Sequence, residues 1–515
     1  MHDFSDVTWK IALLLQLQTG AGIGLAGDYD DFWAKGFERH GFRIFDLNRP
    51  QPSGLDGKLL DAVIRFPRGD GRIESSLGEL LGTLNDRGQF LGFFRHRWTL
   101  TGGMRTAIRN LLAPHSNGLA ASLRIIRRAG LADTAVWVPI PKLQIPEELV
   151  TRTDYAEIAT SKASSSEIYG AFIAHFHDGF VVAAATRHLG IQALAEKIHC
   201  GMKVRDHSSS TAEIIRFDMR DRGALVLFLR TSEGQDRVCR IADGPTMTEQ
   251  LQRHWDMQFA IREATVGAEK VHSRIPEPCI ELMIDGRKCW IERRMEGTIG
   301  WRLAPKQRHD LSVQLVEFLR DLADVTGRRV TFSERDLFDL INAWQVASSR
   351  LSPTQDVESE LNRLSRYLIA RFTNVVTTVG WAHGDFGYSN AIAAAKSGQL
   401  QSVIDWETAS DLCPIGVDLF NLLLQSRIIE AKQTLDHAVR ALVQEVQQGK
   451  IGTEIRGIDP YLKRFLPTSA DAMAVLGLTL YRWVQRERRY AADIGWPDGY
   501  FVGALREFTA ALGSN

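Results

Sequence analysis

The stretch that decides the fold lies at residues 381–410 and reads WAHGDFGYSNAIAAAKSGQLQSVIDWETAS. A His-Gly-Asp triplet ends at Asp385, and Asn390 follows after four intervening residues. A hairpin later, an apolar residue and a tryptophan enclose Asp405. In isolation the triplet is a polar turn and the second segment is the end of a strand. By chance, four fixed residues at fixed positions would occur in far fewer than roughly one in a hundred chains of this length. We therefore treat the two segments as one functional pattern.

The pattern resembles that of the aminoglycoside phosphotransferase and choline kinase family, in which His-Gly-Asp, four residues and Asn are followed by apolar-Asp-Trp. The family's pattern parallels the catalytic loop and the metal-binding aspartate of protein kinases. The resemblance implies a kinase-like α+β fold of two lobes, and transfer of the γ-phosphate of ATP to a hydroxyl group of a small molecule. Asp418, in PIGVDLF, matches a downstream aspartate that braces the catalytic loop in this family.

Phosphoryl transfer explains why these residue types are needed. It requires a carboxylate beside the attacking hydroxyl and oxygen ligands that hold Mg²⁺ across the nucleotide phosphates. The resemblance implies that Asp385 accepts or orients the acceptor proton, that Asn390 binds one Mg²⁺ through its amide oxygen, and that Asp405 binds the ions that bridge the phosphates. Mg²⁺ keeps most of its waters, which suits this sparse set. The sequence of residues 386–388 differs from the one more common in the family, and we expect these residues to alter contacts with the acceptor.

Upstream, residues 224–243 read as two strands joined by a polar turn, and residues 248–261 read as a helix. A kinase small lobe presents its phosphate-binding cation and the carboxylate that steadies it in this order. The family normally has Lys at the cation position, whereas this strand offers Arg240, with Glu249 as the expected helical partner. Arginine keeps a permanent positive charge, but its planar guanidinium group requires a different contact geometry from the compact ammonium group of lysine. The alternative is that both are surface residues.

The segment WIERRMEGTIG, at residues 290–300, resembles the hinge of the same family. There, backbone groups near Arg294 and Met295 would bind adenine. A lone edge strand would give the same pattern, so that alternative stays open. The resemblance as a whole extends from about residue 206 to the C-terminus.

The N-terminal part shows alternating strand and helix patterns. KIALLLQLQ reads as a buried strand, TGAGIG as a glycine turn, DDFWAKGFERHG as a helix and FRIFDL as a second strand. Further apolar runs, LLDAVIRF, QFLGFFRHRW and TAVWVPIPK, continue the alternation. The pattern predicts an α/β, Rossmann-like domain with a parallel sheet covered by helices.

In TGAGIG, Gly20, Gly22 and Gly24 follow the predicted strand, and Asp46 ends the next one. This arrangement resembles motif I of class I S-adenosylmethionine-dependent methyltransferases, where glycines admit the cofactor and an acidic residue holds the ribose. Only roughly a dozen residues separate Asp46 from LLDAVIRF, too few for the helix and strand that carry the adenine contact. We expect a degenerate, cofactor-free remnant that serves as a scaffold or acceptor platform. A working methyltransferase and an unrelated α/β binding module are the alternatives.

Composition excludes several classes of protein. At 515 residues the chain exceeds a usual single core, so we expect two or three compact units. The chain has 62 Lys and Arg residues and 62 Asp and Glu residues, so its formal net charge is zero. Overall electrostatic attraction to nucleic acid is therefore not expected. Five scattered cysteines indicate reduced thiols, and we find neither a secretory signal nor an apolar run long enough to span a membrane. We predict a soluble cytoplasmic protein whose oligomeric state the sequence does not give.

We expect four segments: a methyltransferase-like domain at residues 1–150, a mostly helical connection at 151–205, a kinase-like small lobe at 206–300 and a large helical lobe at 301–515. The leading function is ATP-dependent O-phosphorylation of a small molecule. A pseudokinase that binds or regulates, and a bifunctional methyltransferase-kinase, are the alternatives. The C-terminal hundred residues balance basic and acidic side chains, so a sugar or another neutral or anionic metabolite is the preferred acceptor. Arg482, Arg486 and Arg489 are expected on one solvated helical face, with an anionic acceptor as the alternative partner.

Overall fold

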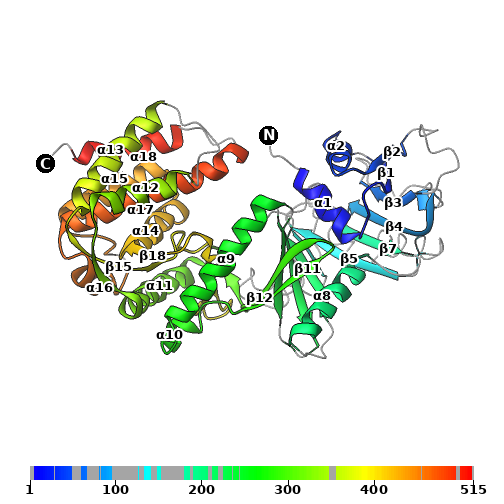
Figure 1. Cartoon of the computed structure of the whole chain (residues 1–515), viewed down its shortest axis with the longest axis horizontal. Helices are drawn as coiled ribbons and strands as arrows, with labels where there is room; N and C mark the ends of the chain where they lie inside the picture. Colours follow the sequence, from blue (N-terminus) through cyan, green and yellow to red (C-terminus); the bar gives the residue numbers. More distant parts are fainter. Residues whose placement is uncertain are drawn as a thin grey trace, which may run out of the picture. The chain divides into compact units, whose positions relative to one another are not determined.

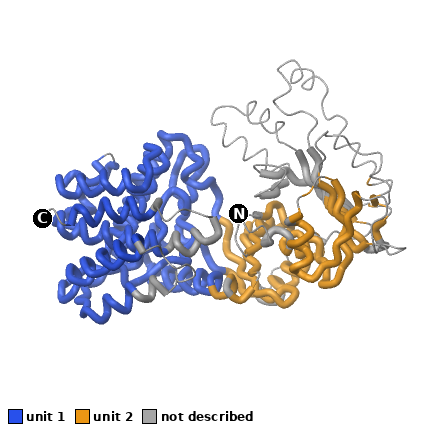
Figure 2. The backbone as a smooth tube through the Cα atoms, turned by 90° about the horizontal axis from the view of Figure 1, so that it is seen from above, with its two compact units in different colours: residues 1–2, 250–278, 295–515 blue, residues 3–249, 279–294 orange. Residues whose placement is uncertain are grey.

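The protein is described here from a computed structural model that divides into two compact units (Figure 2). The helical unit comprises residues 1–2, 250–278 and 295–515, and the sheet unit comprises residues 3–249 and 279–294. The structure describes residues 5–27, 29, 31–48, 60–66, 80–81, 83–95, 126, 131, 133–140, 148–151, 179–185, 190–206, 212–218, 224–232, 234, 236–242, 244–346, 355–453, 455–494 and 499–512.

The sheet unit is built on one twelve-stranded sheet in the order β11-β12-β10-β9-β8-β6-β5-β7-β4-β3-β1-β2 (Figure 1). Its strands are β1 (Gly22–Ala26), β2 (Arg43–Asp46), β3 (Leu60–Arg65), β4 (Leu84–Arg95), β5 (Asp133–Ile140), β6 (Glu148–Thr151), β7 (Gly179–Ala185), β8 (Ala212–Asp218), β9 (Ala224–Thr231), β10 (Arg237–Ala242), β11 (Pro278–Ile284) and β12 (Arg287–Arg293). The helices α1 (Ser5–Leu14), α2 (Asp31–Arg39) and α8 (Gly190–Asp206) belong to the same unit. Helix α9 (Pro245–Ala264) begins in the sheet unit and continues into the helical unit.

The parallel part of the sheet confirms part of the α/β expectation. Strand β1 pairs in parallel with β2 and β3, and β3 pairs in parallel with β4. All residues of β1 are buried, as expected for a strand covered on both faces. The first predicted strand is wrong, because KIALLLQLQ forms the end of α1 and the turn after it. A short apolar run does not distinguish a buried helix from a buried strand, and Leu, Ala, Lys and Gln favour helix.

The glycines of TGAGIG lie elsewhere than the predicted turn between a strand and a helix. Gly22 and Gly24 are inside β1, and a Cβ on Gly24 would lie 2.5 Å from Leu47. The turn after β1 is made at Gly27, whose φ is 87°. Asn48 accepts from the Gly27 N–H at 2.9 Å and donates to its carbonyl at 2.8 Å. The backbone at the carboxyl end of β1 is therefore bound by a side chain of this chain.

The remainder of the sheet is antiparallel, which the sequence pattern did not predict. Strand β7 pairs antiparallel with both β4 and β5, so the expected parallel continuation into β5 is wrong. Strand β6 then pairs with β8, and β8 with β9. Where a mostly helical connection was expected at 151–205, the structure describes both strand β7 and helix α8. The compact unit consequently runs past residues 150 and 205 to residue 249.

A single hydrophobic core joins the N-terminal helices to the later strands of the sheet unit. The core includes Trp9 from α1, Ile198 from α8 and Ile291 from β12. Gly201 of α8 leaves room for Leu282 of β11, because a Cβ there would lie 2.8 Å from the leucine side chain. At the surface of this contact, Lys197 pairs with Asp285 at 2.6 Å. These segments therefore bury their apolar surface against one another.

The helical unit contains two three-stranded antiparallel sheets among its helices (Figure 1). One sheet has the order β13-β16-β17 and the other β14-β15-β18. The strands are β13 (Thr298–Ile299), β14 (Arg328–Thr331), β15 (Val376–Ala382), β16 (Ala391–Ala393), β17 (Leu400–Val403) and β18 (Ser410–Pro414). The helices are α10 (Glu269–His272), α11 (Pro305–Thr326), α12 (Glu334–Val346), α13 (Gln355–Phe372), α14 (Val417–Ile429), α15 (Leu435–Gln448), α16 (Ile458–Phe465), α17 (Ser469–Ile494) and α18 (Gly499–Leu512), with 3₁₀ turns η2 (Gly300–Arg302) and η3 (Trp406–Thr408).

Helix α14 is the central helix of this unit. It is apolar on nearly all sides, its residues are almost all buried, and it packs against α11, α15 and α17. A helix that is hydrophobic all round is stable only when other elements surround it. The few polar side chains of α14 therefore have defined partners inside the protein, and several of them lie against the segment between β15 and β16. No helix among the described residues combines the length and apolar composition that a membrane span requires.

Candidate active site

The loop after β15 is held by its backbone. The N–H groups of His383 and Gly384 donate to the two carboxylate oxygens of Asp418 at 2.6 and 2.8 Å. The ring of His383 is buried, and its Nε2 donates to the carbonyl of Ile404 at 2.7 Å while its Nδ1 accepts from the Asp385 N–H at 3.2 Å. These partners fit a neutral imidazole protonated on Nε2. Asp418 thus braces the loop, as the family resemblance implied, and His383 ties the loop to the end of β17.

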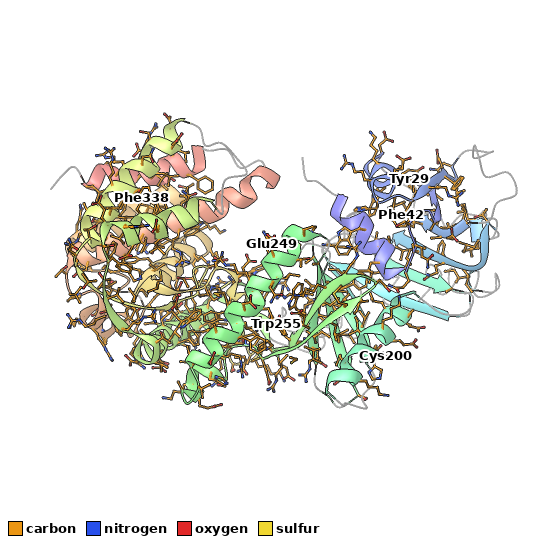
Figure 3. The ribbon with its side chains drawn as sticks, in the orientation of Figure 1. Tyr29, Phe42, Cys200, Glu249, Trp255 and Phe338 are labelled. Carbon is orange, nitrogen blue, oxygen red and sulfur yellow. The ribbon has the colours of Figure 1, made fainter. Side chains whose placement is uncertain are left out.

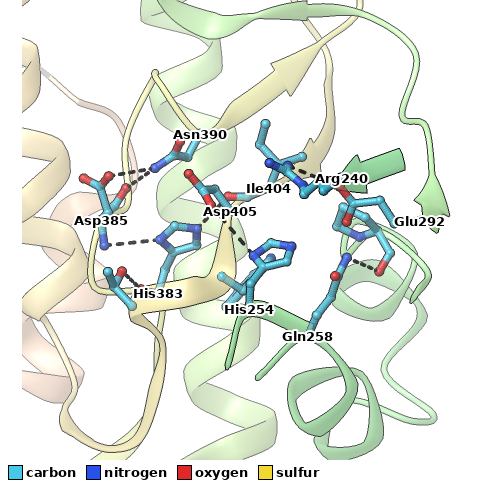
Figure 4. Close-up of polar contacts among 12 residues, drawn as sticks. Arg240, His254, Gln258, Glu292, His383, Asp385, Asn390, Ile404 and Asp405 are labelled. Atoms are coloured by element: carbon cyan, nitrogen blue, oxygen red, sulfur yellow. Dashed lines mark hydrogen bonds and ion pairs between the residues drawn. The ribbon is translucent and has the colours of Figure 1, made fainter. Parts of the chain in front are cut away.

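Asp385 and Asn390 lie together in this loop (Figure 4). The amide nitrogen of Asn390 donates to the Asp385 carbonyl at 2.8 Å and to Asp385 Oδ2 at 3.1 Å. The buried Asn390 side chain is therefore oriented with its amide nitrogen toward the aspartate, so its amide oxygen points to another side. That oxygen is the type of ligand that Mg²⁺ prefers.

Asp405 follows β17 and is brought to Asn390 by the backbone, because the Ile404 N–H donates to the Asn390 carbonyl at 2.8 Å. Asp405 has left-handed φ and ψ of 70° and 59°, a conformation that aspartate tolerates better than most residues. Its side chain is 43% exposed, so an ion from solvent can reach it. The buried Trp406 fixes this turn by donating from its ring nitrogen to the Val403 carbonyl at 2.8 Å.

The sequence analysis missed His254, which lies on α9 in the same unit as Asp405. Its Nδ1 is 3.8 Å from Asp405 Oδ1, and its ring is buried (Figure 4). The helix that carries it is predicted from the sequence, with Glu249 in its first turn as the candidate residue. A lone histidine inside an amphipathic helix gives no signal of its partner, because the partner comes from a strand far along the chain.

Side chains of the catalytic loop alternate between the protein interior and the site. Phe386 is buried and stacks on Phe318 with ring centroids 6.0 Å apart. Tyr388 is also buried, its hydroxyl lies 2.5 Å from Ser312 Oγ, and burial raises the pKa of the tyrosine. The expectation that residues 386–388 alter acceptor contacts is therefore wrong for these two side chains, which fill the core. Gly387 lies between them.

Arg482 of α17 is not on a solvated face, and the side chains of Arg486 and Arg489 lie outside the part of the chain that the structure describes. Its guanidinium is buried and donates to the Thr408 carbonyl at 2.8 Å and to the Cys413 sulfur at 2.9 Å. The Thr408 hydroxyl in turn donates to the His383 carbonyl at 2.8 Å. A Cβ on Gly384 would lie 2.5 Å from the same guanidinium. Arg482 thus joins α17 to the catalytic loop and to the turn after Asp405.

In the sheet unit, the carboxylate beside Arg240 is Glu292, at 3.3 Å (Figure 4). Both side chains are largely buried, with exposed fractions of 18% and 10%. Arg240 stands opposite Trp290 in the pairing of β10 with β12, so Glu292 is its diagonal neighbour. Glu249, the partner expected from the sequence, is exposed on α9 (Figure 3). The sequence missed Glu292 because the register of two strands far apart in the chain sets this contact.

Arg294, in the predicted hinge, is already engaged within the sheet unit. Its N–H donates to the Asp236 carbonyl at 3.0 Å, and its guanidinium pairs with the Asp236 carboxylate at 2.7 Å. The division between the two units falls between Arg294 and Met295. The predicted adenine contact would therefore use the Arg294 carbonyl or the backbone of Met295.

The described residues include no group of three or more His, Cys, Asp or Glu side chains that would hold a metal ion by themselves. The candidate Mg²⁺ ligands are one carboxylate, Asp405, and one amide, Asn390. Both present oxygen atoms, and Mg²⁺ commonly completes such a set with water and phosphate oxygens. The residues therefore fit a Mg²⁺ ion that arrives with a nucleotide.

Comparison with known proteins finds a family match for part of the chain. Residues 220–447 match the model of the phosphotransferase enzyme family. No curated protein matches the chain. The match begins at residue 220, so the methyltransferase resemblance of the N-terminal region gains no support from it and stays a prediction.

Similar solved structures include a putative aminoglycoside phosphotransferase from Ralstonia eutropha, which is 15% identical, with 61% of this chain and 95% of that chain covered and a TM-score of 0.39. A thermostable mutant of aminoglycoside phosphotransferase APH(4)-Ia, in a ternary complex with AMP-PNP and hygromycin B, is 14% identical, with 61% and 99% covered and a TM-score of 0.37. The GDP complex of aminoglycoside 2'-phosphotransferase-IIIa is 15% identical, with 61% and 98% covered and a TM-score of 0.36. The part of the chain that matches the phosphotransferase enzyme family, residues 220–447, includes Arg240, Asp385, Asn390 and Asp405.

Proposed function

We propose that this protein transfers the γ-phosphate of ATP to a hydroxyl group of a small molecule. The observation that carries the proposal is the linkage of Asp385, Asn390 and Asp405. Asn390 donates to the Asp385 carboxylate, and its carbonyl accepts from the residue before Asp405. A proton acceptor and two oxygen ligands are thus held in one braced loop and the adjoining strand end, as phosphoryl transfer requires.

In the proposed reaction, Asp385 receives or orients the proton of the acceptor hydroxyl. The acceptor oxygen forms a bond to the γ-phosphorus while the bond from that phosphorus to the β,γ-bridging oxygen breaks, and ADP leaves with that oxygen. Asn390 and Asp405 would hold Mg²⁺, which supplies positive charge to the phosphate oxygens when it is bound with the nucleotide. The bonds to Asp418 and His383 keep the loop in place, so little reorganisation is needed during transfer.

ATP is the proposed donor, as the family resemblance of the Asp385, Asn390 and Asp405 pattern implies. We propose Arg240, which is paired with Glu292 at 3.3 Å in the sheet unit, as the cation for the phosphates. Arginine always carries its charge, and a partner carboxylate fixes the direction of its fork. Met295 and the Arg294 carbonyl are proposed for adenine. Glu249 is exposed, so we propose for it only a weaker contribution to nucleotide binding.

The proposed acceptor is a neutral or anionic hydroxyl compound such as a sugar. The balanced charge of the C-terminal region supports this choice, since a polycationic aminoglycoside would favour an acidic cavity.

A pseudokinase is the second candidate for the function of the chain, and the replacement of the usual lysine by Arg240 is the observation that favours it. We propose that the N-terminal region acts as a scaffold. A cytoplasmic setting is supported by the five cysteines, none of which forms a disulfide.

The test is ADP release from Mg-ATP with a panel of hydroxylated metabolites, using Asp385→Ala as the matched control. We expect one class of acceptor to stimulate release in the parent and none to do so in the variant. Nucleotide binding by calorimetry should be retained in both. If the parent binds Mg-ATP while no acceptor or water molecule is phosphorylated, the pseudokinase is the correct reading.

A further inference from the structure

The structure assigns to Gln425 the task of positioning Asp385 toward a neutral acceptor hydroxyl. This inference rests on the proposed function, because it concerns the same carboxylate. Gln425 lies on α14, and no sequence motif points to it. It is a positioning residue, and it forms part of the surface that the acceptor meets.

The first argument comes from the face of α14 that follows the catalytic loop. Asp418 accepts from the N–H groups at the start of the loop, and Asn421 donates to the Gly384 carbonyl at 3.2 Å. Gln425 lies one turn further on, and its Nε2 is 3.5 Å from Asp385 Oδ1. Positions separated by three and four residues share one side of a helix. The same side of α14 therefore fixes first the backbone of the loop and then the carboxylate at its tip.

The second argument concerns the two oxygens of Asp385. Oδ2 accepts from Asn390, whereas Oδ1 faces the Gln425 amide nitrogen. Both of these donors are neutral amides, so they orient the carboxylate without neutralising its charge. A separation of 3.5 Å is long for a hydrogen bond, and such contacts in catalytic sites commonly shorten when substrate is bound.

The third argument explains a glycine. Phe386 and Tyr388 point into the core, so Asp385, Gly387 and Ser389 form the opposite side of the loop. A Cβ on Gly387 would collide with the Gln425 amide. The backbone of Gly387 lies outside the left-handed region, so φ alone does not require glycine. The amide of Gln425 occupies the space that a side chain at residue 387 would need.

The fourth argument gives the acceptor class. The Ser389 hydroxyl donates to Gln425 Oε1 at 3.5 Å, so an amide and a hydroxyl lie next to Asp385 on this side of the loop. Such groups both donate and accept, and they bind a hydroxyl or a water molecule without requiring charge. A cationic acceptor would be better served by a second carboxylate at this position. The geometry therefore favours a neutral, hydroxyl-bearing acceptor.

The test uses the full chain and water as the acceptor, with slow Mg-ATP hydrolysis measured as ADP release. Gln425→Leu should reduce the rate about tenfold while nucleotide affinity and melting temperature stay unchanged, because a hydrogen bond to a charged group is lost. Gln425→Glu keeps the size of the side chain but cannot donate, and we expect at least the same loss. Gln447→Leu, an exposed glutamine on α15, is the control and should behave as the parent.

Gly387→Ala supplies an independent variant, because it should displace the flexible end of Gln425 without disturbing the helix. It should show the same loss as Gln425→Leu, and the double variant should lose no more than either single variant. Parent-like rates in both Gln425→Leu and Gln425→Glu would overturn the inference, as would a loss explained by nucleotide affinity alone. ADP release in neither the parent nor any variant would instead speak against the proposed function itself.

Discussion

The catalytic loop of the helical unit and the Arg240 pair of the sheet unit are specified in different ways. The loop between β15 and β16 places Asp385 and Asn390 within one short segment, and buried backbone bonds to Asp418 hold it. Arg240 instead takes its position from the pairing of β9, β10 and β12, and its partner Glu292 comes from a strand outside its hairpin. A local motif therefore identifies the first arrangement, whereas only strand register identifies the second.

The largest expected effect concerns the sheet unit, which shares one core between its N-terminal segments and its later strands. Removal of residues 1–205 would expose the β8 edge and the apolar surface that covers Leu282. We expect the remaining chain to be insoluble, because an unpaired hydrophobic edge strand promotes aggregation. Expression and size-exclusion chromatography of this truncation, beside the full chain, would test the point. A soluble, monomeric product with nucleotide affinity equal to that of the parent would show that the shared core is dispensable.

The next effect separates two aspartates within the helical unit. Asp385→Ala should lower acceptor phosphorylation by about 10²- to 10⁴-fold, the usual contribution of a general base, and should leave Mg-nucleotide affinity nearly intact. Asp405→Ala should weaken Mg-nucleotide binding itself, because the proposed Mg²⁺ ligand is lost. Calorimetric titration with Mg-ATP beside single-turnover assays would distinguish the two variants. Equal loss of nucleotide affinity in both would contradict the division of roles.

A smaller effect is expected for the cation of the sheet unit. Arg240→Ala should lose about tenfold to a hundredfold in nucleotide affinity or rate, since a charge-assisted hydrogen bond is worth about 1.5–3 kcal/mol. Glu292→Ala should lose less, and the double variant should lose little more than Arg240→Ala, because the two residues act as one pair. Glu249→Ala, with an exposed carboxylate, is the matched control. A larger loss in Glu249→Ala than in Glu292→Ala would favour the partner expected from the sequence.

The smallest effect should be found with S-adenosylmethionine. Asn48 already binds the backbone at Gly27, and Gly24 leaves room only for Leu47 and Leu60. Calorimetry with the full chain should therefore show no binding at millimolar cofactor. A clear isotherm that Asp46→Ala abolishes would revive the bifunctional alternative and would mean that the N-terminal region is a working methyltransferase.

The sequence by itself determined the residues whose chemistry is encoded at short range. The spacing of Asp385, Asn390 and Asp405 identified the candidate site and the family, because a loop and the adjoining hairpin bring these residues together whatever surrounds them. The strands β2, β3 and β4, and the parallel pairing of β3 with β4, were likewise predictable from apolar runs, whereas β1 lies where the sequence pattern predicted a glycine turn. Local patterns failed at KIALLLQLQ, where a continuous apolar run is compatible with both helix and strand.

Only the tertiary structure decided which distant groups meet. Strand register placed Glu292 beside Arg240, helix packing buried Arg482 against the turn after Asp405, and α14 brought Gln425 to Asp385. The tertiary structure also joined the N-terminal segments and the later strands into one sheet. These strand pairings could not be predicted from turn sequences. The physical reason is the same in each case. Burial and pairing depend on surfaces contributed by segments far apart in the chain, and periodicity within one segment carries no information about its partner.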